Sequence, residues 1–489
     1  MTAEHFDVLI VGAGLSGIGA AWHLKKHCPG KCYAILEGRA ASGGTWDLFR
    51  YPGVRSDSDM YTLGYRFKPW VDDKSIADGA TILNYIRETA RENGIDRHIR
   101  YGCRVLRADW SSAEALWTVQ VERDGVAEAL TAGFVMMCSG YYSYAAGYKP
   151  DFGGAEEFQG RIVHPQFWPD DLDCAGRNII VIGSGATAVT LVPALADLGA
   201  HVTMLQRSPS YVASRPAHDA LAIRLRKWLP AKTAYGLTRW KNVLLGLFFF
   251  GLARRKPKAV KKRLIGMVQD RLGPDYDVGT HFTPRYNPWD QRVCAVPDDD
   301  LFKAIGAGKA EVVTDTIERF VADGIKLVSG TVLPADVIVT ATGLALNVLG
   351  DVAFAIDGVA VDFSKTMSYK GMMFSDVPNL TSVFGYTNAS WTLKADLTSD
   401  YVCRILNTME RRGVAIVTPR RNDPSVTEQP FLDFSSGYVM RALDKLPKQG
   451  SKKPWMLHQS YMLDLVSLKF GRVDDGTLEF SNPGHTKAA

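Results

Sequence analysis

Residues 6–17, FDVLIVGAGLSG, decide the fold of this chain. An unbroken run of apolar and β-branched residues is typical of a buried parallel strand, and here it leads into the pattern Gly12-x-Gly14-x-x-Gly17. The first glycine permits a tight turn, and the second lets backbone N–H groups approach a pyrophosphate. The third lets the following helix pack closely on the strand. The stretch therefore predicts a dinucleotide-binding βαβ unit.

The same pattern returns at residues 178–188, NIIVIGSGATA. Its fingerprint is Gly183-x-Gly185-x-x-Ala188, in which alanine is an accepted variant of the third glycine. Two βαβ units this far apart predict an α/β protein with two Rossmann-like, doubly wound domains.

The two units differ at the end of their second strand. Glu37 lies 20 residues after Gly17, where a carboxylate bonds ribose hydroxyls. The second unit has Arg207 and Ser208 at the matching place, and a guanidinium pairs with a 2′-phosphate that a carboxylate would repel. We therefore expect FAD at the first turn and NADPH, rather than NADH, at the second. The alternative for the first turn is an ordinary strand–helix turn with Glu37 exposed to solvent. The alternative for Arg207 is a surface arginine at the end of a strand, with no role in binding a phosphate.

The order of the motifs predicts a chain that leaves the first domain, builds the second and returns. Two further apolar strands, 134–138 and 337–341, each end in a small polar residue and glycine, which suits a crossing between domains. The predicted segments are a first FAD part at 1–142, a linker at 143–176, a first NADPH part at 177–214, a helical insertion at 215–295, an NADPH return at 296–341 and a second FAD part at 342–489.

Composition places the chain among globular proteins of the cytoplasm. It has 489 residues, 46% hydrophobic and 22% charged, which is enough to bury sizeable cores. The seven cysteines show neither zinc-site nor CxxC spacing, so we expect reduced thiols and no metal. Cys28 and Cys32 lie away from the glycine turn, which argues against thiol–disulfide chemistry. The N-terminus lacks the features of a signal peptide.

The predicted insertion carries a marked excess of positive charge. Between Ala220 and Gln269 there are 13 Lys and Arg residues and no acid, whereas the whole chain carries only +5. The 11-residue apolar run 243–253, VLLGLFFFGLA, is too short to span a membrane. We expect a helical cap over the NADPH domain, with its apolar run buried and its lysines solvated. The alternative is peripheral membrane association through residues 221–268, because basic residues around apolar ones are the composition of an interfacial segment. No motif for nucleic acid accompanies the charge.

The linker contains Phe158-x-Gly160-x-x-x-His164-x-x-x-Trp168-Pro169. This pattern resembles, position for position, the signature of Baeyer–Villiger monooxygenases, a family of class B flavoprotein monooxygenases. The resemblance implies that FAD, reduced by NADPH, activates O2 as a C4a-peroxyflavin that inserts one oxygen atom into a ketone. It also implies a role for the signature in domain movement, with His164 as a strut between domains.

Other segments extend the resemblance over nearly the whole chain. The segment from Gly43 through Trp46 and the Tyr51-Pro52-Gly53 turn match the loop that passes close to the flavin ring in the family, and Thr342-Gly343 matches its second inter-domain crossing. Phrases such as SDSDMYTLG and GYTNASWTLKADL are similar to those of the mycobacterial subgroup that activates thioamide prodrugs such as ethionamide.

The resemblance also places the catalytic residues. Arg292, in NPWDQR, falls at the active-site arginine, a permanent cation suited to stabilising an oxyanion. Asp57 falls where the family has the carboxylate that holds this arginine near the flavin. The alternatives are a structural salt bridge for Arg292 and a turn for Asp57. Gln291 stands where other branches of the family often have a lysine that contacts the NADPH phosphate. Discrimination between NADPH and NADH therefore rests more on Arg207. Asn388, Ser390 and Trp391 are candidates for the border of the substrate pocket, with core packing as the alternative.

The residues expected at the flavin are Gly12, Gly14, Leu15, Ser16, Gly17, Glu37, Gly44, Thr45, Trp46, Asp57 and Tyr61. Those expected at NADPH and at the second crossing are Gly183, Ser184, Gly185, Ala186, Thr187, Ala188, Arg207, Ser208, Thr342 and Gly343. The expected substrates are a small ketone or sulfide and O2. A sulfur- or nitrogen-oxidising flavin monooxygenase and a flavin-binding redox sensor are the alternatives.

Overall fold

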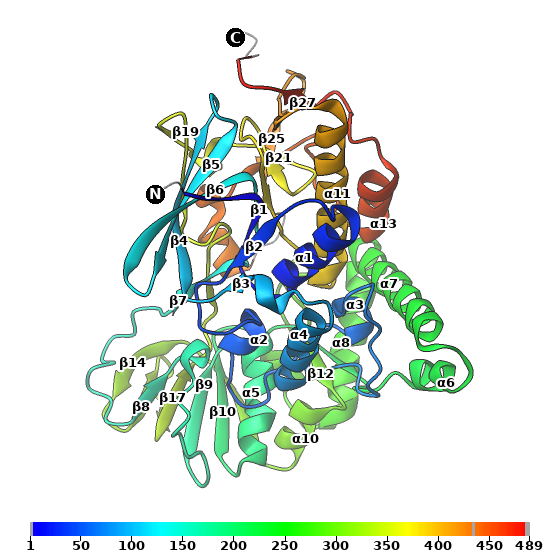
Figure 1. The fold of residues 1–489 in the computed structure, drawn as a ribbon. Helices are drawn as coiled ribbons and strands as arrows, with labels where there is room; N and C mark the ends of the chain where they lie inside the picture. Colours follow the sequence, from blue (N-terminus) through cyan, green and yellow to red (C-terminus); the bar gives the residue numbers. More distant parts are fainter. Residues whose placement is uncertain (1–2, 433–435, 485–489) are drawn as a thin grey trace.

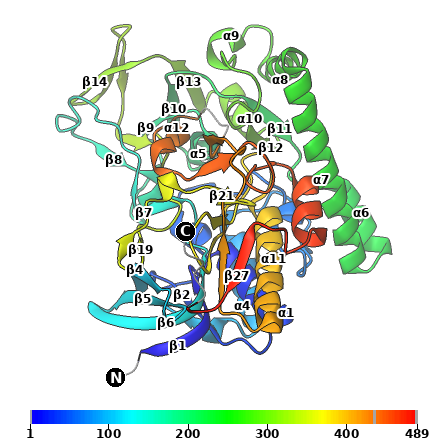
Figure 2. The same cartoon turned by 90° about the horizontal axis from the view of Figure 1, so that it is seen from above.

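The computed structural model describes residues 3–432 and 436–484. The extreme ends of the first and last predicted segments, and residues 433–435, lie outside the described residues. Figure 1 shows two sheets, one in the upper and one in the lower half of the molecule, with helices gathered along one side. Figure 2 shows the same arrangement from above.

The larger sheet is built around β1, whose last four residues are fully buried. Its order is β20-β19-β4-β5-β6-β1-β2-β3, and β23 also pairs with β6. β1 runs parallel to β2 and β6, whereas β4, β5 and β6 form an antiparallel meander. The strands are β1 (Glu4–Val11), β2 (Tyr33–Leu36), β3 (Ile99–Arg100), β4 (Cys103–Ser111), β5 (Leu116–Arg123), β6 (Val126–Met137), β19 (Ala353–Ile356), β20 (Val359–Ala360) and β23 (Leu380–Ser382).

Two helices from opposite ends of the chain pack together beside this sheet. α1 (Leu15–His27) follows the first glycine turn, and α11 (Trp391–Arg412) lies next to it in both views (Figures 1 and 2). Together with β19, β20 and β23, α11 brings the C-terminal part of the chain back to the first domain.

The smaller sheet contains five parallel strands in the order β13-β10-β9-β17-β8. β9 (Asn178–Ile182), α5 (Ala186–Asp197) and β10 (His201–Gln206) form the predicted second βαβ unit. The remaining elements are β13 (Ala310–Thr314), β17 (Val337–Thr340), β8 (Arg161–Val163) and the covering helix α10 (Asp300–Gly306). The segment predicted as a linker thus contributes an edge strand, β8, because its backbone completes the free edge of β17.

The α/β class with two dinucleotide-binding folds is confirmed. The central strands β9 and β17 read as nearly continuous apolar runs in the sequence because they are buried on both faces. This is why the pattern could be recognised without the structure.

The basic insertion is helical and contacts both domains. It consists of α6 (Ala220–Trp228), α7 (Ala231–Arg255), α8 (Pro257–Leu272) and the short α9 (Val278–His281). α7 packs on α3 (Met60–Leu63) of the first domain, whereas α8 packs on α10 and on β11 (Val212–Arg215), which pairs with β12 (Cys294–Pro297). The guanidinium of Arg239 is buried and donates to the carbonyls of Tyr61 and Gly64, both at 2.8 Å.

The expectation of a cap with a buried apolar run is wrong. Within that run Val243 and Ala253 are buried, but Phe248 and Phe249 are 62% and 53% exposed. The physical reason is that a run that is apolar all round the helix meets the protein on one side only, so the other side faces outward. No helix of the described residues has the length and apolar character needed to cross a membrane.

Candidate functional site

The two domains share one large cavity of about 1260 Å³. Both glycine turns open into it, and so does the segment that carries Arg292. The predicted cofactor residues that line it are Gly12, Gly14, Leu15, Ser16, Glu37, Gly44, Thr45, Trp46, Asp57, Gly183, Ser184, Gly185, Ala186, Thr187, Arg207, Ser208, Thr342 and Gly343. The cavity is larger than a typical small-ligand pocket, as two dinucleotides require.

The first turn has the geometry that a pyrophosphate needs. Gly12 has a φ of +105°, and a side chain there would collide with the carbonyl of Cys138, where β6 ends. A methyl group at Gly17 would overlap the carbonyl oxygen of Gly12, so this glycine permits the contact between α1 and the turn. Gly14 faces Gly44, so the two backbones meet without side chains between them. FAD would fit this cradle, and the N-terminus of α1 would supply partial positive charge to its phosphates.

Glu37 is 5% exposed and is held by the backbone of the same turn. Its Oε2 accepts from the N–H of Ala13 at 2.8 Å, and its Oε1 accepts from the N–H of Arg39 at 3.0 Å. Burial raises the pKa of this carboxyl above its ordinary value, and the two N–H groups oppose the shift. The carboxylate is therefore fixed at the strand end where ribose hydroxyls are expected.

The second turn repeats this design in a more open form. Gly183 has a φ of +141°, and a side chain there would collide with the carbonyl of Ala341, just after β17. Around Gly185 there is open space. Arg207 follows β10 directly and is exposed, and the hydroxyl of Ser184 donates to the carbonyl of Ser208 at 3.0 Å.

Arg292 and Asp57 meet across the cavity although 235 residues separate them. Arg292 Nη1 donates to Asp57 Oδ2 at 3.4 Å, and the two side chains are 46% and 27% exposed. Burial acts to lower the pKa of Arg292, but the charge of Asp57 outweighs it, together with Tyr141 and Tyr438, and the net shift is upward. The guanidinium therefore carries its charge at every physiological pH.

Three further residues surround this pair and were missed by the sequence analysis. Tyr141, Cys294 and Tyr438, which lies on α12 (Gly437–Met440), are close enough to Arg292 to influence its pKa. Burial raises the pKa of Tyr438 and that of Cys294 to about 12, so both stay protonated. No motif marks them, because they meet Arg292 only through the fold.

The three residues proposed to border the substrate pocket, Asn388, Ser390 and Trp391, do not all lie at the cavity. Trp391 lines the cavity, and its Nε1–H donates to Ser16 Oγ at 2.8 Å beside the first glycine turn. Ser390 and Asn388 instead bond to neighbouring protein groups.

Three predicted cofactor residues do not line the cavity. Gly17 and Ala188 lie in the first turns of α1 and α5 and are buried, because the third position of the fingerprint is a packing position. Tyr61 lies elsewhere than expected: it is fully buried and packs on Tyr235 of α7.

The signature residues Phe158, Gly160, His164, Trp168 and Pro169 also lie outside the cavity wall. The ring of His164 packs so closely on Gly147 that no side chain fits there, and Gly147 ends β7 (Tyr142–Gly147), which pairs with β18 (Leu344–Leu346). Burial lowers the pKa of His164, and the nearby backbone of Gly343 opposes the shift. His164 Nδ1 accepts from the backbone N–H of Gln166 at 3.2 Å, and its role as a strut between domains stays a prediction.

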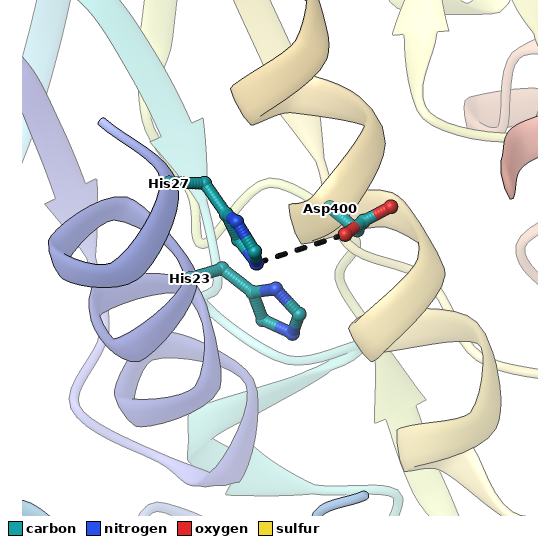
Figure 3. Close-up of side chains that lie close together, drawn as sticks. All are labelled: His23, His27 and Asp400. Carbon is teal, nitrogen blue, oxygen red and sulfur yellow. Dashed lines mark ion pairs between the residues drawn. The ribbon is translucent and has the colours of Figure 1, made fainter. Parts of the chain in front are cut away.

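One other cluster of titratable groups lies between α1 and α11 (Figure 3). Among the described residues, the ligand atoms of His23, His27 and Asp400 lie within 4.8 Å of one another. Lys469 Nζ, however, lies 3.0 and 3.1 Å from the two oxygens of Asp400. Because an ammonium group already matches this carboxylate, we interpret the cluster as part of the contact between the two helices.

Two dinucleotide folds that open into one cavity define the class of a flavin- and nicotinamide-dependent oxidoreductase. Two family models agree with this class: "NAD(P)-binding Rossmann-like domain" matches residues 10–68, and "Flavin-binding monooxygenase-like" matches residues 68–225. The chain is 57% identical to the FAD-containing monooxygenase EthA of Mycobacterium tuberculosis over 479 residues, which cover 98% of both chains. It is 48% identical to the probable FAD-binding monooxygenase AlmA of an Acinetobacter species, over 99% of this chain and 98% of that one. The chain belongs to this family of FAD-containing monooxygenases.

Solved structures support the architecture. An oxidised steroid monooxygenase bound to NADP superposes with a TM-score of 0.76 at 20% identity, over 98% of this chain and 100% of that chain. A cyclohexanone monooxygenase with bound ε-caprolactone superposes with a TM-score of 0.77 at 19% identity, with the same coverage. The protein is thus an FAD-containing monooxygenase with a second dinucleotide-binding fold.

Proposed function

We propose that this monooxygenase carries out Baeyer–Villiger oxidation, inserting one oxygen atom into a ketone to give an ester or lactone, and that it also oxidises sulfides and thioamides. The observation that carries the proposal is the Arg292–Asp57 pair in the cavity that both glycine turns share. The Phe158 to Pro169 signature supports the same conclusion.

Each residue of the site has a task in this reaction. FAD, reduced by NADPH, supplies activated oxygen when it is bound. Arg292 presents several directed donors to the substrate carbonyl oxygen as negative charge develops on it. Asp57 orients the guanidinium from the flavin side. Tyr141 and Tyr438 remain neutral and keep water from the reacting atoms.

Oxygen transfer to a soft sulfur atom creates no oxyanion on the substrate. The cation at Arg292 therefore contributes less to sulfide or thioamide oxidation than to ketone oxidation. This difference separates the proposed reaction from that of a flavin monooxygenase that oxidises only sulfur or nitrogen.

The test compares Arg292→Ala with the wild-type enzyme on a ketone and on a sulfide. Ester formation should fall by about 10²- to 10³-fold, as for loss of an oxyanion donor, while NADPH oxidation continues. Sulfoxide formation should fall much less. Arg285→Ala, which removes an exposed arginine seven positions earlier, serves as the control. Unchanged ester formation in Arg292→Ala, or wild-type enzyme that oxidises sulfides but no ketone, would refute the proposal.

A further inference from the structure

The outer surface of the insertion is unusually apolar. Of the 21 large hydrophobic side chains that are exposed in the described chain, eight lie on α6 and α7 and four more on the C-terminal turns that follow Tyr461. They are Leu221, Trp228, Leu237, Trp240, Leu244, Leu245, Phe248, Phe249, Met462, Leu463, Val466 and Phe470. Together they form what we call the α7 surface.

The two parts of the α7 surface, on α7 and on the C-terminal turns, adjoin at the periphery of the molecule. Trp240 of α7 lies 6.0 Å, ring centre to ring centre, from Tyr461, which begins α13 (Tyr461–Asp464). Both views show α6 and α7 at the outer edge of the molecule, with α13 beside α7 (Figures 1 and 2). On α7, residues 237, 240, 244 and 248 follow the spacing of one helix face. A patch of this kind marks an interaction site.

Basic side chains surround the apolar residues. Of the 13 Lys and Arg residues in 220–269, Arg239 is buried and Arg226, Lys241 and Arg254 have acidic partners. Eight others are exposed: Arg224, Lys227, Lys232, Arg255, Lys256, Lys258, Lys262 and Arg263. Most of them lie at the two ends of α7, so positive charge flanks the apolar face.

We propose that the α7 surface docks on an anionic lipid bilayer, with α7 lying in the plane of the interface. Aromatic and leucine side chains between basic residues are the composition of interfacial helices. A second copy of the chain fits this surface poorly, because a symmetric contact would bring two sets of uncompensated cations together. The proposal does not depend on the proposed reaction.

Docking in this orientation has a consequence for the cavity. The ring of Phe250 lies 6.2 Å from that of Trp289, and Arg254 Nη1 lies 3.2 Å from Asp290 Oδ1. Both partners belong to the segment that carries Arg292. The bilayer would therefore lie about one helix diameter, roughly 10 Å, from the active-site segment.

The test measures how the FAD-loaded protein sediments with vesicles. Wild-type protein should bind vesicles that contain phosphatidylglycerol, bind phosphatidylcholine vesicles far less, and be released by salt. Phe248→Ser combined with Phe249→Ser should weaken binding by at least about tenfold, because two exposed aromatic anchors are lost. Lys258→Glu combined with Lys262→Glu should weaken it on anionic vesicles only.

Controls use the same chemistry on other surfaces. Val126→Ser with Val359→Ser removes two exposed apolar side chains of the larger sheet, and Lys365→Glu reverses an exposed charge; neither should change binding. Failure of the wild type to bind at low salt, or full binding by the Phe248 and Phe249 variant, would overturn the proposal. A second contradicting result would come from light scattering. If the wild type were a dimer, and if the Phe248 and Phe249 variant lost both the dimer and vesicle binding, a second copy of the chain would be the occupant of this surface. An acidic protein that binds in place of vesicles would overturn it too.

Discussion

The two glycine turns are constructed alike but differ in how closed they are. At each one, a strand end crosses over the first glycine: the Cys138 carbonyl faces Gly12, and the Ala341 carbonyl faces Gly183. At the first turn the strand that follows ends in a buried carboxylate bonded to two backbone N–H groups. At the second turn it ends in the exposed Arg207.

This difference matches the roles of the two cofactors. A site whose polar groups are already fixed by the protein needs little reorganisation, which favours a nucleotide that stays bound. An open site with an exposed cation favours a nucleotide that enters and leaves in every catalytic cycle. We therefore expect the first turn to retain its cofactor and the second to exchange its cofactor, a difference set by a few residues at the ends of strands.

The largest effect is expected from Gly17→Ala. The added methyl group overlaps the Gly12 carbonyl, which cannot move without opening the turn, so we expect a loss of about 3 kcal/mol in stability and poor FAD retention. Flavin absorbance of the purified protein and thermal unfolding measure both. The matched change at the second turn, Ala188→Gly, should cost only about 1 kcal/mol. Equal losses for the two variants would contradict the asymmetry.

A smaller effect is expected from Arg207→Ala. Loss of a charge-assisted pair with the 2′-phosphate should raise the KM for NADPH by about 10- to 100-fold and leave the KM for NADH nearly unchanged. Steady-state kinetics with both nucleotides measure this, and FAD content and thermal stability should stay at wild-type values. A parallel rise in both KM values would show that Arg207 does not recognise the phosphate.

The smallest effect concerns pH. Because burial raises the pKa of Glu37 above its ordinary 4.5, the folded state binds this proton more tightly than the unfolded state. The stability it contributes is fully present below about pH 4.5 and is lost as pH rises through the native pKa. In the apoprotein, Glu37→Gln should flatten this decline, by roughly 1 kcal/mol for each unit of pKa shift.

Urea unfolding of the apoprotein at a series of pH values measures this slope. Arg207→Ala should keep the wild-type slope, because a guanidinium does not titrate in this range. A slope that Glu37→Gln leaves intact would mean that another group causes it.

Much of the site could be predicted because its residues sit at fixed offsets from strands. Glu37 and Arg207 each follow the second strand of a βαβ unit, and the glycines precede its helix, so local pattern places them. Arg292 and Asp57 were placed by resemblance, and the structure brings them within 3.4 Å. Tyr141, Tyr438 and Trp391 reach the same cavity from three unrelated segments, and no spacing in the chain encodes that meeting.

The insertion is a second region in which the sequence alone does not show which residues are buried. Its composition indicates helices with both apolar and basic character, but the run 243–253 is apolar at almost every position. Such a run has no polar face to show which side packs. Only the docking of Arg239 and Val243 on the first domain decides that Phe248 and Phe249 face outward.

Local periodicity and the offsets of a few glycines were thus enough to predict two dinucleotide folds, because that property depends on neighbours within one βαβ unit. The composition of the shared cavity and the exposure of α7 required the assembled chain. They depend on contacts between residues up to several hundred positions apart, and such contacts exist only after the two domains have packed together.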